Sequence, residues 1–166
     1  MAAITASTAN ELRQKTNAGM MDCKKALTET NGDMEAAIDI LRKKGIASSA
    51  KRADREAKEG TVQAILNADS TVGALVEVNC ETDFVGKNEG FRSFVDVVAQ
   101  HIVDAGPADA DLAAALAQPV PASNGLSLQD VIKEKGGIVG ENIVLRRFRR
   151  FAAPANGTIA SYIHLG

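Results

Sequence analysis

The chain has 166 residues, of which 45% are hydrophobic and 4% aromatic, enough for one medium-sized domain or two small ones. Its 19 basic and 21 acidic residues give a net charge of −2, so the overall charge does not indicate a nucleic-acid partner. No apolar run approaches the roughly 20 residues that a membrane-spanning helix needs. The first residues also lack the pattern of a secretory signal. We therefore expect a cytoplasmic protein that has no membrane segment.

The residues that commonly carry catalysis or bind metals form no recognisable set. Cys23 and Cys80 are far apart in the sequence and have no C-x-x-C spacing, which leaves one disulfide open but predicts no metal site. Neither His101 nor His164 has a partner that would make it a catalytic base. No phosphate-binding loop or dinucleotide fingerprint is present. We therefore expect a protein that is not an enzyme and that uses no metal or cofactor.

Residues 1–45 are expected to form a domain of three short helices. Thr8 and Glu11 have the spacing of a capping box at the start of the first helix. In the third helix, apolar residues follow the i, i+3, i+4, i+7 pattern, with Asp33 as its cap and Gly45 as its end. A bundle of this size buries little surface, so we expect it to be only marginally stable alone.

Residues 46–60 differ in composition from the segments on either side. They are polar, rich in alanine and in charges of both signs, and poor in large apolar side chains. One interpretation is a nucleic-acid-binding stripe, but the mixed charges and the absence of aromatic residues favour a solvated helical linker. We therefore place a domain boundary here, between residues 1–45 and residues 61–166.

Residues 61–166 are expected to form an α+β core, in which an antiparallel sheet packs against helices. Alternating apolar residues over 62–66 and 72–80, joined by the turn NADS, predict a hairpin with one buried face. Asn88 is placed to cap a helix with an apolar stripe over residues 91–102.

The rest of the core is expected to contain two more helices, over residues 109–117 and 127–135, and a second hairpin. The turn PANG separates the two strands of that hairpin. In its first strand, residues 146–151 (RRFRRF) combine arginines with aromatic rings, as nucleic-acid-binding segments do. The motif is short and the chain is acidic overall. These facts favour an ordinary strand with Phe148 or Phe151 inward and its arginines paired with acids.

Two apolar features do not fit a core pattern. Met20 and Met21 cannot both face inward on one helix, so one of them is expected to be an exposed partner contact. Phe84 lies after the strand that ends at Cys80 and before the helix stripe that begins at Phe91. It belongs to neither set, so it either folds back as a plug or is presented to a partner.

Three segments make the sequence similar to the bacterial elongation factor Ts family: LRQKTNAGMMDCKKAL (12–27), EVNCETDFVGKN (77–88) and the shorter GENIVLRRF (140–148). The order of the parts fits this family throughout the chain. The resemblance implies a ubiquitin-associated-like domain of three helices, a linker and an α+β core. It also implies a translation elongation factor that acts as guanine-nucleotide exchange factor on elongation factor Tu.

The resemblance further implies which residues contact elongation factor Tu. A loop is expected to enter the partner near its magnesium and phosphate site and to disturb that site. The loop consists of four residues, Thr82, Asp83, Phe84 and Val85. The N-terminal domain is expected to grip the partner's nucleotide domain through three residues, Arg13, Met20 and Met21. No direct contact with nucleic acid is expected.

Two alternatives remain open at this point. Residues 1–45 would suit a ubiquitin-associated-type interaction module without exchange activity. Residues 146–151, together with the basic linker, would suit an RNA-binding protein with strongly salt-dependent affinity. The sequence also departs from the family at Gly86, where Ala or Ser is common, which predicts a slightly looser loop. Longer family members carry a second half of the core after the point where this chain stops.

Overall fold

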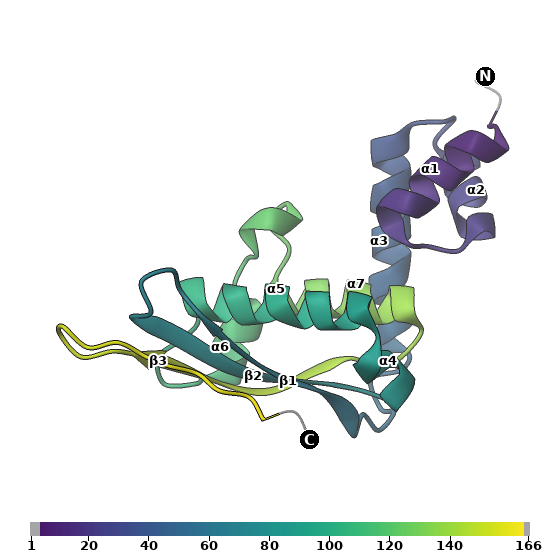
Figure 1. Cartoon of the computed structure of the whole chain (residues 1–166). Helices are drawn as coiled ribbons and strands as arrows, with labels where there is room; N and C mark the ends of the chain where they lie inside the picture. Colours follow the sequence, from purple (N-terminus) through teal and green to yellow (C-terminus); the bar gives the residue numbers. More distant parts are fainter. Residues whose placement is uncertain (1–3, 165–166) are drawn as a thin grey trace. The chain divides into compact units, whose positions relative to one another are not determined.

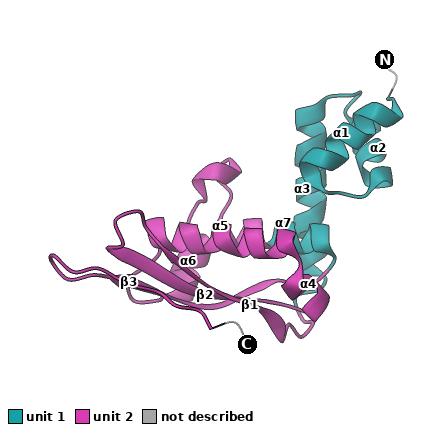
Figure 2. Cartoon of the chain, in the orientation of Figure 1, with its two compact units in different colours: residues 1–53, 133–140 teal, residues 54–132, 141–166 magenta. Residues whose placement is uncertain are grey.

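The computed structural model describes residues 4–164 of the chain. The chain divides into two compact units, unit 1 (Met1–Ala53 and Lys133–Gly140) and unit 2 (Asp54–Ile132 and Glu141–Gly166) (Figure 2). Within residues 4–164, no helix is both long and apolar enough to cross a membrane. The elements in chain order (Figure 1) are α1 (Ala6–Thr16), α2 (Met20–Glu29), α3 (Met34–Ala50), β1 (Glu59–Leu66), β2 (Val72–Cys80), α4 (Asp83–Lys87), α5 (Glu89–Ala105), α6 (Leu112–Ala117), the 3-10 helix η1 (Pro121–Ser123), α7 (Leu128–Val139) and β3 (Val144–Ala152).

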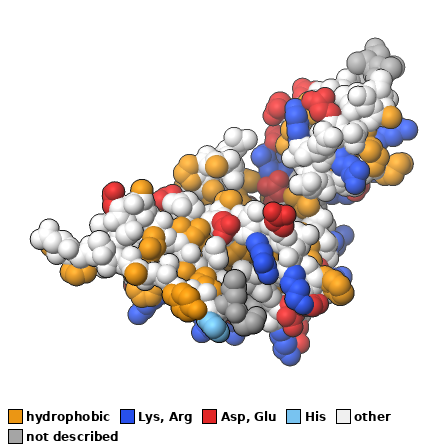
Figure 3. Space-filling model, in the orientation of Figure 1, with side chains coloured by type: hydrophobic (Ala, Val, Ile, Leu, Met, Phe, Trp, Pro, Cys, Tyr) orange, Lys and Arg blue, Asp and Glu red, His pale blue; other side chains and the backbone are white. Residues whose placement is uncertain are grey.

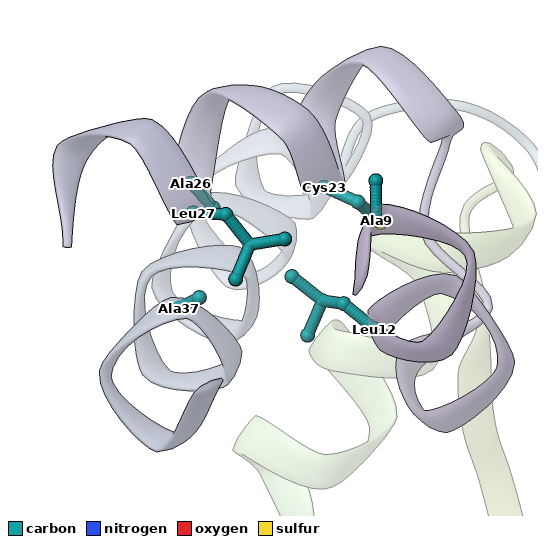
Figure 4. Packing of buried hydrophobic residues seen from close by; sticks show 6 residues of the cluster. All are labelled: Ala9, Leu12, Cys23, Ala26, Leu27 and Ala37. Atoms are coloured by element: carbon teal, nitrogen blue, oxygen red, sulfur yellow. The ribbon is translucent and has the colours of Figure 1, made fainter. Parts of the chain in front are cut away.

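Unit 1 contains the predicted bundle of three helices, α1, α2 and α3. Its centre is small, because alanines supply half of the fully buried positions. Partly buried residues such as Ile38 and Leu41 pack around this centre. The buried cluster (Figure 4) consists of Ala9, Leu12, Cys23, Ala26, Leu27 and Ala37.

In unit 1 the observed N-cap of α3 is the predicted residue, whereas that of α1 is not. Asp33 caps α3 as predicted, and its Oδ1 accepts a hydrogen bond from the backbone N–H of Ala36 at 3.0 Å. In α1 the cap is Thr5, whose hydroxyl accepts from the N–H of Thr8 at 3.2 Å. The prediction that Thr8 is the cap is therefore wrong. The helix gains an earlier turn because Thr5 can cap equally well and alanines, which favour helix, follow it.

Gly45 does not end the third helix, as the sequence predicted, because α3 continues to Ala50. Its role is close packing within unit 1, where Gly137 of α7 lies against it. A methyl group added to Gly137 would lie 2.4 Å from the Cα and the carbonyl oxygen of Gly45. The absence of a side chain at Gly137 allows the backbones to approach this closely. Residues 46–50 of the predicted linker therefore continue α3, and residues 51–58 have no regular element.

Unit 2 has the predicted α+β architecture, an antiparallel sheet with strand order β1-β2-β3 packed against helices. β1 and β2 form the predicted hairpin, and its turn is closed by a hydrogen bond of 3.0 Å from Ser70 N to Asn67 O. Asn88 caps α5 as predicted, and α5 lies across one face of the sheet (Figure 1). The buried residues of β2 and α5 include Ala74, Val76, Val78, Cys80, Phe91, Val95, Val98 and Ile102.

β3 contains the RRFRRF motif and pairs with β2 through a shifted register. Glu77 lies opposite Arg147, whereas the next residue, Val78, lies opposite Leu145. Arg146 is therefore an extra residue in a β-bulge, which interrupts the alternation of inward and outward side chains.

The bulge decides which side chains of β3 face the core. Leu145 and Phe148 are both buried although they are three positions apart, whereas Phe151 is 47% exposed. This outcome fits the ordinary strand that the sequence favoured and identifies Phe148 as its inward phenylalanine.

The predicted second hairpin forms only in part. Its turn is present, because the N–H of Gly157 donates to the carbonyl of Pro154 at 2.8 Å. Residues 158–164 that follow are not a strand. The N–H of Ile159 donates instead to the carbonyl of Ser70 at 2.7 Å, so the chain bonds to the β1–β2 turn. This competing partner explains why the alternating pattern of the last residues does not produce a paired strand.

Candidate protein-binding site

The segment predicted to be a loop after β2 is the short helix α4, and it exposes Phe84. The residue is 83% exposed, whereas Phe91, seven positions later, is 1% exposed in the core. Phe84 therefore does not fold back as a plug, which was one of the two alternatives for this ring. The ring is presented to solvent from a regular element.

The start of α4 is fixed by Thr82. Its backbone is extended (φ −121°, ψ 151°), and its hydroxyl oxygen accepts a hydrogen bond from the N–H of Val85 at 3.4 Å. A threonine in this position is a typical N-cap, because its side chain satisfies an N–H that has no partner in the helix. Thr82 therefore explains why an α-helical turn begins directly after the strand.

The end of α4 is held against β1. The hydroxyl of Thr61 donates to the carbonyl of Gly86 at 3.1 Å. Gly86 is buried, and a methyl group added to it would lie 3.2 to 3.4 Å from the backbone of Gly60. The glycine that departs from the family pattern thus lies at a close contact between α4 and the sheet.

Asp83 places a negative charge beside the exposed ring. Its Oδ2 lies 2.7 Å from Nζ of Lys87, one helical turn later. The hydrogen bond and the positive charge of Lys87 lower the pKa of Asp83, and Asp83 in turn raises the pKa of Lys87. Asp83 is therefore ionised at neutral pH, and α4 presents an apolar ring next to a carboxylate.

The residues expected to bind the partner in unit 1 lie on α1 and α2. Met20 is 39% exposed and Met21 is 74% exposed, so both methionines reach the surface, Met21 more than Met20. Arg13 is exposed on α1, next to the buried Leu12. These three residues belong to unit 1, whereas Thr82, Asp83, Phe84 and Val85 belong to unit 2.

Glu141 is a neighbour of this site that the sequence analysis did not single out. Its Oε2 accepts hydrogen bonds from the N–H of Glu81 at 2.9 Å and from the N–H of Thr82 at 3.1 Å. Its Oε1 accepts from the hydroxyl of Thr82 at 2.6 Å. The only sequence signal for Glu141 was its place in the GENIVLRRF segment.

Cys80 and Cys23 are both buried and free. The thiol of Cys80 donates to the carbonyl of Thr82 at 3.2 Å. Burial, together with the negative charges of Glu141 and Glu59, raises the pKa of Cys80 to about 11. Cys80 therefore remains a neutral thiol at physiological pH and helps to hold the residue that caps α4. Among residues 4–164, no cluster of three His, Cys, Asp or Glu side chains is suited to a metal ion.

Two of the four arginines of β3 have protein partners, and one of these partners is an acid. Nε of Arg147 donates to Oε2 of Glu77 at 2.6 Å, and Nε of Arg150 donates to the carbonyl of Val103 at 3.0 Å. Positive and negative side chains are also interspersed on the face shown in Figure 3. The motif thus has the contacts expected of an ordinary strand.

The fold and the exposed site define a class: an α+β protein with a bundle of three N-terminal helices and an aromatic ring presented on a capped helical turn. The family described as Elongation factor TS matches residues 81–166, just over half of the chain. The chain belongs to the elongation factor Ts family.

Three relatives named Elongation factor Ts are similar to nearly the whole chain. The protein of Trichlorobacter lovleyi is 48% identical over 164 residues, which are 99% of this chain and 52% of that protein. That of Thioalkalivibrio sulfidiphilus is 50% identical over 161 residues, 97% of this chain and 53% of its own length. That of a Nostoc species is 50% identical over 167 residues, with 100% and 52% covered. The chain spans about half the length of the curated relatives it matches.

Proposed function

We propose that this chain acts as a guanine-nucleotide exchange factor, which binds elongation factor Tu carrying GDP and accelerates the release of GDP. The observation that carries the proposal is the exposure of Phe84, at 83%, on a helical turn held at both ends. Membership of the elongation factor Ts family supports the choice of partner. The proposal involves no covalent chemistry and no cofactor.

The energetic requirement of exchange follows from thermodynamic linkage. A factor that weakens its partner's hold on a nucleotide must itself be bound more weakly when that nucleotide is present, by the same coupling free energy. Accelerating release by about 10⁴-fold requires a barrier lower by about 5.5 kcal/mol. A contact close to the bound nucleotide is the most direct way to supply this free energy.

α4 has the chemistry to disturb a magnesium and phosphate site. Mg²⁺ requires nearly ideal octahedral geometry, so a small displacement of its ligands is costly. The ring of Phe84 would displace the partner's side chains. The ionised carboxylate of Asp83 would meet the ligand shell of the ion. Thr82 and Val85 hold the turn on which both side chains lie.

The exposed residues of unit 1 supply the affinity in this proposal. Met20 and Met21 are flexible and polarisable side chains that adapt to a partner's surface, and exposed apolar groups commonly mark such contacts. Arg13 adds an exposed positive charge. Unit 1 would bind the nucleotide domain of the partner, while α4 acts on its nucleotide site.

The proposal is tested by measuring the release of labelled GDP from elongation factor Tu, with and without the chain. The variants Phe84→Ala and Met21→Asp separate the two roles. Phe84→Ala should slow release by well over tenfold while changing the binding affinity by less, because the ring acts on the pocket. Met21→Asp should weaken binding, since a charge would replace an apolar contact.

Both variants should unfold at nearly the parental temperature, because both side chains are exposed. Phe91→Ala is the matched control for a buried ring and should lower the free energy of unfolding by about 3–5 kcal/mol. If Phe84→Ala releases GDP at the parental rate, α4 is only a connector. Binding without any acceleration by the parent chain would instead indicate an interaction module.

A further inference from the structure

The two segments that meet at Glu141 are joined by hydrogen bonds in both directions. Glu141 accepts from the backbone of residues 81 and 82, and Oε1 of Glu81 accepts from the N–H of Asn142 at 2.6 Å. Each segment thus supplies a carboxylate to the backbone of the other. We call this group of residues the carboxylate clamp, consisting of Glu81, Thr82, Glu141 and Asn142.

A third segment closes the carboxylate clamp from the side. The amide Nδ2 of Asn142, a buried residue, donates to the carbonyl of Arg55 at 2.7 Å. Nη1 of Arg55 lies 3.5 Å from Oε2 of Glu81. Because each carboxylate has partners on another segment, turning either Glu81 or Glu141 away would break hydrogen bonds between the segments.

The clamp reaches α4 through the hydroxyl of Thr82. A hydroxyl has a single proton, and here it is donated to Oε1 of Glu141 at 2.6 Å. The lone pairs of the Thr82 hydroxyl oxygen are therefore free to accept from the N–H of Val85, and this bond is the N-cap bond of α4. Glu141 thus orients the cap of the helix that carries Phe84. The Phe84 ring itself is not covered by the clamp and remains exposed.

We propose that Glu141 is a positioning residue for nucleotide exchange, which holds the backbone of residues 82–85 and so fixes the point from which the Phe84 ring projects. This inference rests on the exchange function proposed above. A turn whose backbone is ordered before binding loses less conformational entropy when it meets its partner, so more of the contact energy remains to act on the nucleotide site. Glu141 acts through Thr82 and α4, and not by touching the partner.

The first measurement is hydrogen exchange of backbone amides in the chain alone. In Glu141→Ala, the amides of Glu81, Thr82 and Val85 should exchange about tenfold faster or more, because each loses a bond or its support. The matched control is Glu89→Ala, which removes an exposed carboxylate from the first turn of α5. It should leave these three amides at their parental rates.

The second measurement is GDP release from elongation factor Tu with the single variants and with the double variant Phe84→Ala/Glu141→Ala. Glu141→Ala alone should slow release by about tenfold. In the Phe84→Ala background it should cause a much smaller further loss, because most of the clamp's effect passes through the ring and only the part that passes through Asp83 remains. Should Glu141→Ala fail to fold, Glu141→Gln keeps one acceptor oxygen and should give a smaller loss of the same kind.

The outcomes separate this inference from the proposed function. If Glu141→Ala accelerates GDP release as much as the parent does, the positioning role is overturned and the proposed function stands. The same conclusion follows if Glu141→Ala causes an equal loss in the parent and in the Phe84→Ala protein. A parent chain that does not accelerate release, or a Phe84→Ala variant as active as the parent, overturns the proposed function and this inference with it.

Discussion

Buried asparagines in unit 2 are held by hydrogen bonds from their side chains to backbone carbonyls. Nδ2 of Asn79 donates to the carbonyl of Glu59 at 3.0 Å, and the buried Asn142 donates within the carboxylate clamp. A buried amide without such a partner would cost free energy. His101 is a buried titratable residue of the same unit. It lies on α5, and burial lowers its pKa against the opposing effects of Gln118 and Asp104.

His101 should make the stability of the chain depend on pH. Its pKa in the folded state is below the value near 6.5 of the unfolded state, so the unfolded state binds more protons in the window between them. The contribution of neutral His101 is complete above about pH 6.5 and is lost as the pH falls toward the folded-state pKa. Urea unfolding of the parent and of His101→Asn, from about pH 7 to about pH 5, measures this loss.

The parent should lose more stability on acidification than His101→Asn does. Groups such as the partly buried Glu134, whose pKa is raised by desolvation, act equally in both proteins and cancel in the comparison. His164→Asn changes the exposed histidine and should follow the parent. Identical pH profiles for the parent and His101→Asn would show that His101 does not carry the effect.

At the scale of whole elements, glycines set how closely the backbones approach. Gly60 of β1 has φ +144°, and a methyl group added to it would lie 2.2 Å from the carbonyl oxygen of Val78. Gly86 of α4 rests against the backbone of Gly60. Gly137 has the equivalent role in unit 1, where α7 meets Gly45 of α3.

Gly45 and Gly137 should respond differently to alanine. A methyl group on Gly45 would have an ordinary contact, 3.6 Å from the carbonyl oxygen of Glu134, so Gly45→Ala should gain up to about 1 kcal/mol from helix propensity. A methyl group on Gly137 would meet backbone at 2.4 Å, so Gly137→Ala should lose about 1–3 kcal/mol as the helices separate. Urea unfolding measures both changes, and equal effects would contradict the packing described.

Elements with local signals were predictable from the sequence, and those that depend on distant partners were not. The cap at Asn88 and the stripe of α5 lie within one segment, so periodicity predicts them correctly. The bulge at Arg146 follows from pairing with β2, and no local pattern indicates it. Gly45 was misinterpreted for the same reason, because its partner Gly137 is on another helix.

The residues of the candidate site also fall into those that a local sequence pattern indicates and those that only distant contacts reveal. Phe84 stood out because it fits neither the strand nor the helix period, and the structure shows it exposed. The N-cap bond of Thr82 to Val85 spans three positions. The bond of Thr82 to Glu141 joins residues 59 positions apart. A single sequence does not indicate such pairs, so the clamp became visible only in the structure.

For the whole molecule, the organisation into two units raises the question of where the chain is most easily opened. The sequence predicts a boundary over residues 46–60. In the structure α3 extends to Ala50, and residues 51–58 have no regular element and are largely exposed. α7 contributes Lys133–Val139 to unit 1, while its first turn belongs to unit 2. Residues 51–58 contain the first of the three points at which the chain passes from one unit to the other.

Limited trypsin digestion should therefore cut first within residues 51–58. The segment offers Lys51, Arg55 and Lys58, and exposed chain outside regular elements is cleaved most readily. Lys87 and Arg92 are the internal comparison, because both lie on helices of unit 2. Mass spectrometry of the early fragments identifies the sites. Cleavage after Lys87 or Arg92 at the same time as, or before, cleavage within 51–58 would contradict the boundary.

The carboxylate clamp also has a consequence for the order in which the chain folds. The strand β2 and the helix α4 are neighbours in sequence, but the cap of α4 depends on Glu141, which is translated 59 residues after Thr82. Closing a loop of that length must precede the bond, and contacts of large sequence separation form slowly. The Phe84 turn thus reaches its final form only after the start of β3 has docked. A partially folded or nascent chain therefore does not present its ring as the finished protein does.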